Sequence, residues 1–184
     1  MRITEAALSG LWIVRPEAHE DERGALAEIM RLDRLAAVGP RPSFVQMNHS
    51  YSRANVLRGL HFQWDEPLGK YIRVLRGATF TAAVDIRKRS PTLGRHVALE
   101  LSAENRTCLY APPGFATGFC VLGDGAEVEY LYTAHYNPRG ESNIRWNDAE
   151  IGIGWPLADP VLSERDRRAG SLREWLDSAA SDRL

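Results

Sequence analysis

Residues 71–86 read YIRVLRGATFTAAVDI, and this stretch decides the fold class of the chain. Valine, isoleucine, threonine and aromatic residues dominate it, and these residue types favour strands. Arg76-Gly77 marks a bend, so we expect a pair of strands here. Similar runs, punctuated by Gly, Pro, Asp or Asn, cover Phe44–Asn48, His96–Leu101, Thr107–Tyr110, Thr117–Leu122 and Ala126–Thr133. This even spacing predicts an all-β sandwich, barrel or jelly roll.

Helices are expected in only two places. One short helix is predicted over Leu32–Val38, because Gly39-Pro40 would end it there. The other helical segment is C-terminal, where the stretches starting at Ser163 and Ser171 resemble capping boxes. An apolar stripe at helical spacing follows the second box, formed by Leu172, Trp175 and Leu176. No repeat, low-complexity tract or linker is present, so we expect one domain over residues 1–184.

The bulk composition excludes several function classes. The chain has 184 residues, with 44% hydrophobic and 26% charged residues and a net charge of −1, which gives no general argument for binding nucleic acid or an anionic membrane. The N-terminus lacks the apolar region of a signal peptide, and no run is long enough to span a membrane. Cys108 and Cys120 show no metal or disulfide spacing. We therefore expect a soluble protein in a reducing cytoplasm.

Common cofactor and metal motifs are missing. Gly69-Lys70 lacks the remainder of a phosphate-binding loop, and Gly152-Ile153-Gly154 runs into Trp155-Pro156, which cannot open a helix as a dinucleotide-binding motif must. No two histidines are spaced as a ligand pair on one strand or helix turn; they are His19, His49, His61, His96 and His135. A metal site built from protein side chains is therefore poorly supported.

Four segments place polar residues inside strand-like runs: residues 21–24 (DERG), 57–63 (LRGLHFQ), 126–132 (AEVEYLY) and 162–166 (LSERD). Further motifs in order include residues 44–50 (FVQMNHS), 84–92 (VDIRKRSPT), 113–116 (PGFA), 146–148 (WND) and 155–156 (WP). Together they make the chain resemble the dTDP-4-dehydrorhamnose 3,5-epimerase family, whose members have a cupin-like jelly roll. The resemblance implies a cofactor-independent homodimer that acts on a nucleoside-diphospho-4-keto-6-deoxyhexose. A base removes a proton beside the ketone, an enolate forms, and a proton returns to the opposite face.

The resemblance assigns three catalytic residues. His61 matches the general base, since a histidine titrates near neutrality. Asp166 matches the carboxylate that orients this histidine, and Tyr130, rather than Tyr132, matches the acid that delivers the proton. From the residues alone, His61 could be a packing histidine, Asp166 could complete a helix capping box that begins at Ser163, and Tyr130 could be a core aromatic.

Ten further positions match substrate-binding residues of the family. Lys70 and Arg58 would supply fixed positive charge to an enolate oxygen and a diphosphate, although solvated surface charge is the commoner role of such residues. The full set is Arg23, Glu28, Gln46, Asn48, Arg58, Lys70, Thr117, Tyr136, Glu141 and Arg165.

Two positions depart from the family. Thr117 stands where members commonly carry a histidine, so either the substrate differs or only one of C3 and C5 is epimerised. Residues 24–27 (GALA) are smaller than the aromatic version common in the family, so the sequence does not decide which nucleotide base is bound.

Three rival functions remain at this stage. A ketoisomerase that moves the carbonyl between C3 and C4 would use the same scaffold, but it would not need a tyrosine opposite the base. A non-catalytic sugar-binding protein would be expected to lack the base or the acid. A metal-dependent oxygenase would need clustered ligands, which the histidine spacing disfavours.

Overall fold

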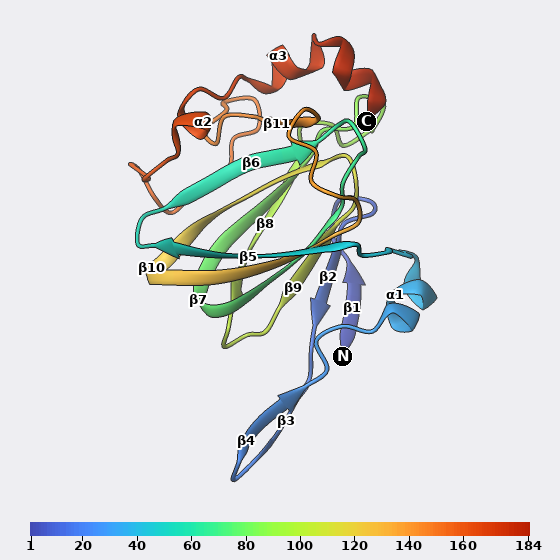
Figure 1. Ribbon diagram of the computed structural model, residues 1–184, viewed down its shortest axis with the longest axis vertical. Helices are drawn as coiled ribbons and strands as arrows, with labels where there is room; N and C mark the ends of the chain where they lie inside the picture. The colour runs from blue at the N-terminus through green and yellow to red at the C-terminus, as the bar shows by residue number, and fades with distance from the viewer.

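The computed structural model describes residues 1–184, and antiparallel strands dominate it (Figure 1). This confirms the predicted all-β class. The strands are β1 (Arg2–Glu5), β2 (Trp12–Arg15), β3 (Ala18–Asp21), β4 (Gly24–Ala27), β5 (Gln46–Arg53), β6 (Leu57–Gln63), β7 (Lys70–Asp85), β8 (His96–Ser102), β9 (Cys108–Ala111), β10 (Phe115–Tyr132) and β11 (Glu141–Asn143). The helices are α1 (Leu32–Val38), α2 (Glu164–Arg167), α3 (Leu172–Leu176) and the short 3-10 helix η1 (Ala179–Arg183).

The two long strands β7 and β10 are shared by two halves of the sheet. Residues 78–85 of β7 pair with residues 115–122 of β10, and this half continues through β8 on one side and β6 and β11 on the other. Residues 70–76 of β7 pair with residues 127–132 of β10, and this half continues through β9, β2 and β1 on one side and β5 on the other. Buried side chains from both halves form one core, among them Ile72, Val74, Leu101, Phe119 and Val128.

The bend predicted at Arg76-Gly77 lies inside β7 rather than between two separate strands. Gly77 has φ +73°, and a Cβ there would lie 2.1 Å from the carbonyl oxygen of Gly125 on the neighbouring strand. Only glycine allows this backbone conformation and this close approach. The two predicted strands over residues 117–122 and 126–133 are likewise joined in β10, whose pairing with β7 shifts register after Leu122.

The N-terminal region adds elements that the sequence did not predict. β1 and β2 extend one half of the sheet, and β3 and β4 form a separate two-stranded hairpin that projects from the body (Figure 1).

Helix α1 has the predicted bounds, and the N–H of Gly39 donates to the carbonyl of Leu35 at its end. Cys108 and Cys120 are both buried and unpaired, and none of the helices has the length and apolar character needed to cross a membrane.

The C-terminal segment covers the outer face of β6 (Figure 1). Ser171 and Glu174 form the complete capping box of α3, as predicted, and the ring of Trp175 packs edge-on against Phe62 with 4.6 Å between centroids. Leu60 and Phe62 both belong to this outer cluster. Because side chains alternate along a strand, His61 lies between them and points to the opposite, inner face.

Candidate active site

A β-bulge in β6 brings two of the predicted residues to the same face. Thr117 of β10 pairs with His61, and Phe119 pairs with Arg58, so two residues of β6 between these pairs are opposed by only one residue of β10. In a regular strand, positions 58 and 61 would point to opposite faces. The extra residue shifts the alternation, and Gly59 and Gly118 allow the two backbones to approach closely here. As a result Arg58 and His61 line one cavity.

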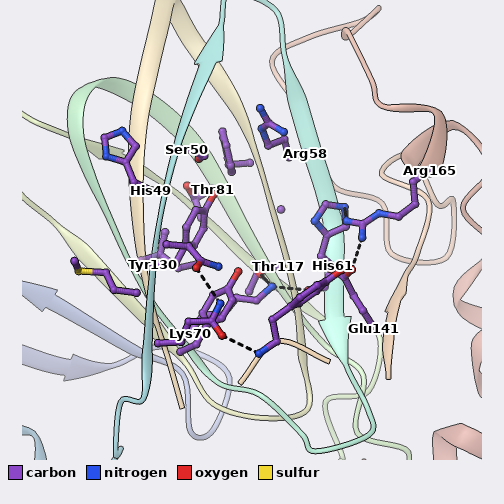
Figure 2. A pocket seen from close by; sticks show the side chains of 18 residues that line it. His49, Ser50, Arg58, His61, Lys70, Thr81, Thr117, Tyr130, Glu141 and Arg165 are labelled. Carbon is purple, nitrogen blue, oxygen red and sulfur yellow. Dashed lines mark hydrogen bonds and ion pairs between the residues drawn. The ribbon is translucent and has the colours of Figure 1, made fainter. Parts of the chain in front are cut away.

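This cavity has a volume of about 680 Å³, which suits a drug-sized or nucleotide-sized ligand (Figure 2). Its walls come from β5, β6, β7, β10 and β11, with Tyr136 and Arg165 at the side where β11 and α2 lie. The lining is predominantly polar, with both cations and hydroxyl groups. No three His, Cys, Asp or Glu side chains gather in the positions that a metal ion would require.

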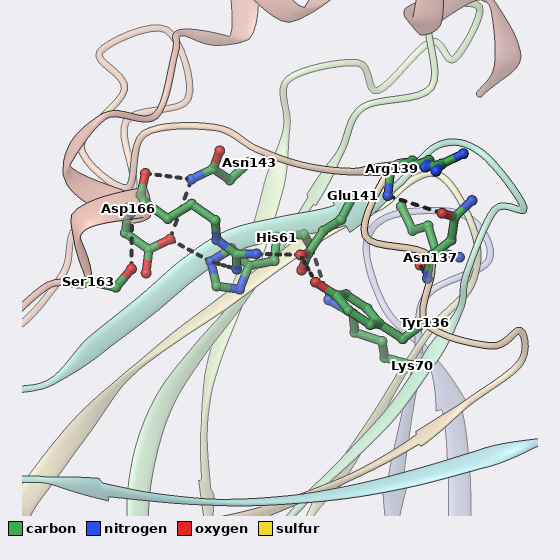
Figure 3. Close-up of polar contacts among 11 residues, drawn as sticks. His61, Lys70, Tyr136, Asn137, Arg139, Glu141, Asn143, Ser163 and Asp166 are labelled. Carbon is green, nitrogen blue, oxygen red and sulfur yellow. Dashed lines mark hydrogen bonds and ion pairs between the residues drawn. The ribbon is translucent and has the colours of Figure 1, made fainter.

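His61 and Asp166 form a hydrogen-bonded pair behind the cavity wall. Nε2 of His61 lies 2.5 Å from Oδ1 of Asp166, whose side chain is almost fully buried. The backbone N–H of Asp166 donates to Oγ of Ser163, the N-cap residue of α2, while the carboxylate of Asp166 faces the histidine (Figure 3). Burial opposes the charge of Asp166, but the hydrogen bond and charge of His61 hold the pKa of that carboxyl below its usual value.

The other ring nitrogen of His61, Nδ1, makes no hydrogen bond within the protein. Only one buried side-chain nitrogen or oxygen atom lacks a hydrogen-bond partner, and it is Nε1 of Trp175. Nδ1 of His61 also lacks a partner, so it is not buried and is open to solvent. Burial lowers the pKa of His61, and the nearby charges of Lys70 and Arg165 add to this effect, whereas Asp166 opposes it. The imidazole is therefore held neutral at pH 7, and Nδ1 is its ring nitrogen without a partner in the protein.

Asn143 supports this pair, and the sequence did not point to it. It lies opposite His61 in the pairing of β11 with β6. Its amide nitrogen donates to the carbonyl oxygen of Arg165 at 3.1 Å and to Oδ1 of Asp166 at 3.4 Å (Figure 3). The amide thus fastens α2 to the sheet at the position where Asp166 meets the histidine.

Tyr130 reaches the same cavity from β10, a different strand from that of His61 (Figure 2). Burial raises the pKa of its phenol well above the ordinary value, against a hydrogen bond from Ser50 that lowers it, so the group is neutral and can donate a proton. The ring of Tyr132 lies 6.1 Å from that of Tyr130, and both side chains line the cavity. Both predicted alternatives therefore face the pocket.

Lys70 lies beneath His61 and Thr117. Its Nζ donates to the carbonyl oxygen of His61 and to Oγ1 of Thr117, each at 3.0 Å (Figure 2). Burial lowers the pKa of Lys70 to about 8, with Glu141 opposing and Arg165 reinforcing the effect. At neutral pH the ammonium group therefore remains a cation in a confined, polar site.

A chain of polar contacts runs along the edge of the cavity. The hydroxyl of Tyr136 donates to Oε2 of Glu141 at 2.8 Å, and the same oxygen pairs with Nη1 of Arg165 at very short range. Nη2 of Arg165 in turn lies 2.9 Å from Nε2 of His61. Gln46 joins from β5, where its Oε1 accepts from the backbone N–H of Tyr136.

Ten of the thirteen predicted site residues line the cavity: Gln46, Asn48, Arg58, His61, Lys70, Thr117, Tyr130, Tyr136, Glu141 and Arg165. Asp166 lies behind His61. Arg23 lies in the turn between β3 and β4 and pairs with Asp21, and Glu28, which directly follows β4, pairs with Arg31 and Arg34; neither residue lines the cavity of this chain. Eight lining residues were not predicted: Met47, His49, Ser50, Ile72, Thr81, Gly118, Phe119 and Tyr132. Several of these could have been predicted from the sequence, because side chains two residues apart on β5 or β10 share the face of a predicted site residue.

Comparison with known proteins gives consistent matches over nearly the whole chain. A family model described as dTDP-4-dehydrorhamnose 3,5-epimerase matches residues 5–174. A dTDP-4-dehydrorhamnose 3,5-epimerase of Neisseria gonorrhoeae is 47% identical over 90% of this chain, and this chain spans about half (51%) of that longer relative. A dTDP-4-dehydrorhamnose 3-epimerase of Streptomyces niveus is 37% identical, covering 97% of this chain and 87% of its own length.

A solved structure is also similar. It is a dTDP-6-deoxy-D-glucose-3,5-epimerase of Legionella pneumophila in complex with dTDP-4-keto-L-rhamnose, with a TM-score of 0.92 and 40% identity. The alignment covers 98% of this chain and 96% of that chain. This agreement confirms the predicted cupin-like jelly roll.

Proposed function

This chain belongs to the dTDP-4-dehydrorhamnose 3,5-epimerase family, and from this premise we propose that it inverts carbons next to the ketone of a nucleoside-diphospho-4-keto-6-deoxyhexose. One observation carries the proposal: an imidazole paired with a buried carboxylate opens into the same cavity as a neutral phenol and a lysine. Proton removal next to a carbonyl needs these three chemical functions, namely a base, an acid and a cation near the developing oxyanion.

His61 acts as the base through Nδ1. When Nε2 donates its proton to Asp166, the lone pair is on Nδ1, the nitrogen without a partner in the protein. Proton uptake turns the ring into an imidazolium, and the carboxylate of Asp166 stabilises that charge. The lowered pKa of His61 keeps the ring neutral at neutral pH, which is the charge state that a base requires.

Tyr130 delivers a proton to the other face of the enolate. The C–H bond beside the ketone breaks toward His61, its electron pair moves into the enolate, and the phenol proton forms the new C–H bond. Lys70, a cation near both His61 and Thr117, stabilises the enolate oxygen. Removal and return from opposite faces gives inversion, whereas return from His61 would restore the starting sugar.

Arg58 and Arg165 are the arginines that line the cavity, and we assign the diphosphate to them. Guanidinium groups suit phosphate oxygens because they donate two parallel hydrogen bonds. The identity of the nucleotide base rests on likeness to the dTDP-sugar enzymes, one of which is solved with dTDP-4-keto-L-rhamnose.

Thr117 bears on how many carbons are inverted. It engages Lys70 and faces the cavity, in the place where the family commonly carries a histidine. Threonine is shorter and carries no charge, so it would hold the sugar less firmly between the two inversions. We therefore infer that inversion at one carbon is faster than at the other, and a relative described as a 3-epimerase fits this view.

We also propose that the protein works as a homodimer. Arg23 and Glu28 are outside their own chain's cavity, so a role for them in substrate binding needs a second copy. The β5 strand pairs only with β10 and leaves an open edge, and Met47 on it is 64% exposed. Leu26 on the projecting hairpin is 75% exposed. An exposed strand edge with apolar side chains is a typical site for association.

The test is incubation with nucleoside-diphospho-4-keto-6-deoxyglucose in heavy water, followed by NMR of the sugar. We expect deuterium at C3, C5 or both, with inversion at the exchanged carbons. A product with the carbonyl moved to C3 would identify a ketoisomerase instead. Binding without any exchange would identify a sugar-binding protein, and either result would overturn the proposal.

A further inference from the structure

Nε2 of His61 has two neighbours that make conflicting demands on it. Asp166 lies 2.5 Å away and can only accept a proton, whereas Arg165 lies 2.9 Å away and can only donate one. A neutral imidazole nitrogen either carries a proton or offers a lone pair. The two contacts therefore require opposite tautomers of the same ring.

The choice of tautomer decides whether the base is available. If Nε2 accepts from Arg165, the ring proton is on Nδ1, which is the nitrogen open to the cavity, and that nitrogen cannot take a proton from the sugar. If Nε2 instead donates to Asp166, the lone pair is on Nδ1 and the base is ready. The guanidinium thus opposes the tautomer that the reaction needs.

Arg165 is held against His61 by a contact that a ligand can replace. Its other terminal nitrogen pairs with Glu141, which also accepts from the hydroxyl of Tyr136 (Figure 3). The side chain of Arg165 is 47% exposed, so it is free to turn toward the cavity. A diphosphate offers more negative charge than one carboxylate, and it binds a guanidinium through two parallel hydrogen bonds.

We propose that Arg165 is a substrate-released latch on His61: it occupies Nε2 in the empty enzyme and moves to the diphosphate when the sugar nucleotide binds. After it leaves, the ring proton moves from Nδ1 to Nε2 by exchange with solvent, Nε2–H donates to the carboxylate of Asp166, and the lone pair of Nδ1 becomes available to the sugar. The base is then active mainly when substrate is present. This inference rests on the proposed function for the identity of the anion, but the tautomer change itself needs no turnover.

Other groups around His61 do not account for this switch. The other charged or titratable side chains that line the cavity are His49, Arg58, Lys70, Tyr130, Tyr132, Tyr136 and Glu141. Lys70 bonds to the backbone carbonyl of His61 and not to its ring. Arg165 and Asp166 are the side chains within hydrogen-bond distance of the ring nitrogens.

The test uses nitrogen-15 NMR of His61, which distinguishes a protonated from an unprotonated ring nitrogen. In the free enzyme we expect Nε2 to be unprotonated, and addition of thymidine diphosphate should exchange the signal types of the two nitrogens. Arg165→Met should show the Nε2-protonated tautomer without any ligand, and Glu141→Gln should shift the free enzyme partly toward it. Arg167→Met, on the same helix but away from the ring, should behave as wild type.

A free enzyme already in the Nε2-protonated tautomer would overturn the latch, and so would an Arg165→Met spectrum identical to wild type. Inorganic pyrophosphate should produce the same exchange of signals if the anion alone releases Arg165. Failure of wild type to place deuterium in the sugar would count against the proposed function and would leave the tautomer comparison to be judged separately.

Discussion

Replacing Asp166 with asparagine gives the sharpest prediction from the dyad. The substitution keeps the size of the side chain and the backbone N–H that Ser163 caps, but it removes the carboxylate charge 2.5 Å from Nε2 of His61. An asparagine amide would also donate to Nε2 and hold the proton on Nδ1, the wrong nitrogen for the reaction. We therefore expect the variant to fold and to lose most of its rate.

The size of the loss follows from the geometry. With 2.5 Å between the nearest atoms, the centres of the imidazolium and carboxylate charges are roughly 4 Å apart, and at an effective dielectric constant of about 20 their attraction is about 4 kcal/mol. Since about 1.4 kcal/mol changes a rate tenfold, kcat should fall about a thousandfold. The acid limb of the pH profile should also move to lower pH, because removal of a nearby anion lowers the pKa of His61.

The assay is the initial rate of deuterium entry from heavy water into the 4-keto sugar, measured by NMR at several pH values. Ser163→Ala is the matched control, because it removes the cap of α2 but no group on the histidine. It should cost about 1 kcal/mol of unfolding free energy and change the rate by less than about tenfold. An Asp166→Asn enzyme with a rate within about tenfold of wild type, or with an unmoved acid limb, would refute the reasoning.

Four further predictions concern neighbouring residues. In a profile of kcat/KM against pH, activity should rise as the pH passes the lowered pKa of His61, because the base must be neutral, and should fall above about pH 8 as Lys70 loses its charge. Lys70→Arg should abolish this alkaline limb, and a limb that persists in the variant would show that another group causes it. Thr117→Val, which removes the hydroxyl partner of the ammonium, should lower kcat/KM about tenfold or more, whereas Thr117→Ser should stay near wild type; equal rates for the two variants would argue against that hydrogen bond. Asn143→Ala removes a hydrogen bond to Asp166 worth about 1 kcal/mol and should lower kcat roughly threefold to tenfold. An unchanged kcat would show that Asn143 does not position the His61–Asp166 pair. Trp175→Ala should lower the free energy of unfolding by about 3–5 kcal/mol in urea titrations, and a loss below about 1 kcal/mol would show that the ring contributes little to holding the C-terminal segment on β6.

The sequence predicted the fold class well because the strand-forming runs are long and well punctuated. It also placed α1 correctly, since Gly39-Pro40 leaves no room to continue the helix. It divided β7 and β10 into shorter strands because a glycine bend reads like a turn, and only the pairing of the two long strands shows that each continues. The hairpin of β3 and β4 was missed because its residues, AHED and GALA, lack the alternation of a half-buried strand.

The site was predicted largely through resemblance, and what the sequence missed depends on three-dimensional placement. Alternation alone would have separated Arg58 from His61, because the bulge that unites them is visible only in the pairing with β10. Asn143 and the contact of Arg165 with the ring depend on where α2 meets β11, and no local pattern reports this. The position of Arg23 outside the cavity is likewise a property of the folded hairpin.

The central claim is that His61 removes the proton and Tyr130 returns one from the other side, and one pair of variants tests it directly. In heavy water with the 4-keto sugar nucleotide, His61→Ala should give neither deuterium exchange nor inversion. Tyr130→Phe should still exchange deuterium, because the base is intact, but should return it mostly to the original face without inversion. Exchange that survives in His61→Ala, or full inversion by Tyr130→Phe, would contradict the account.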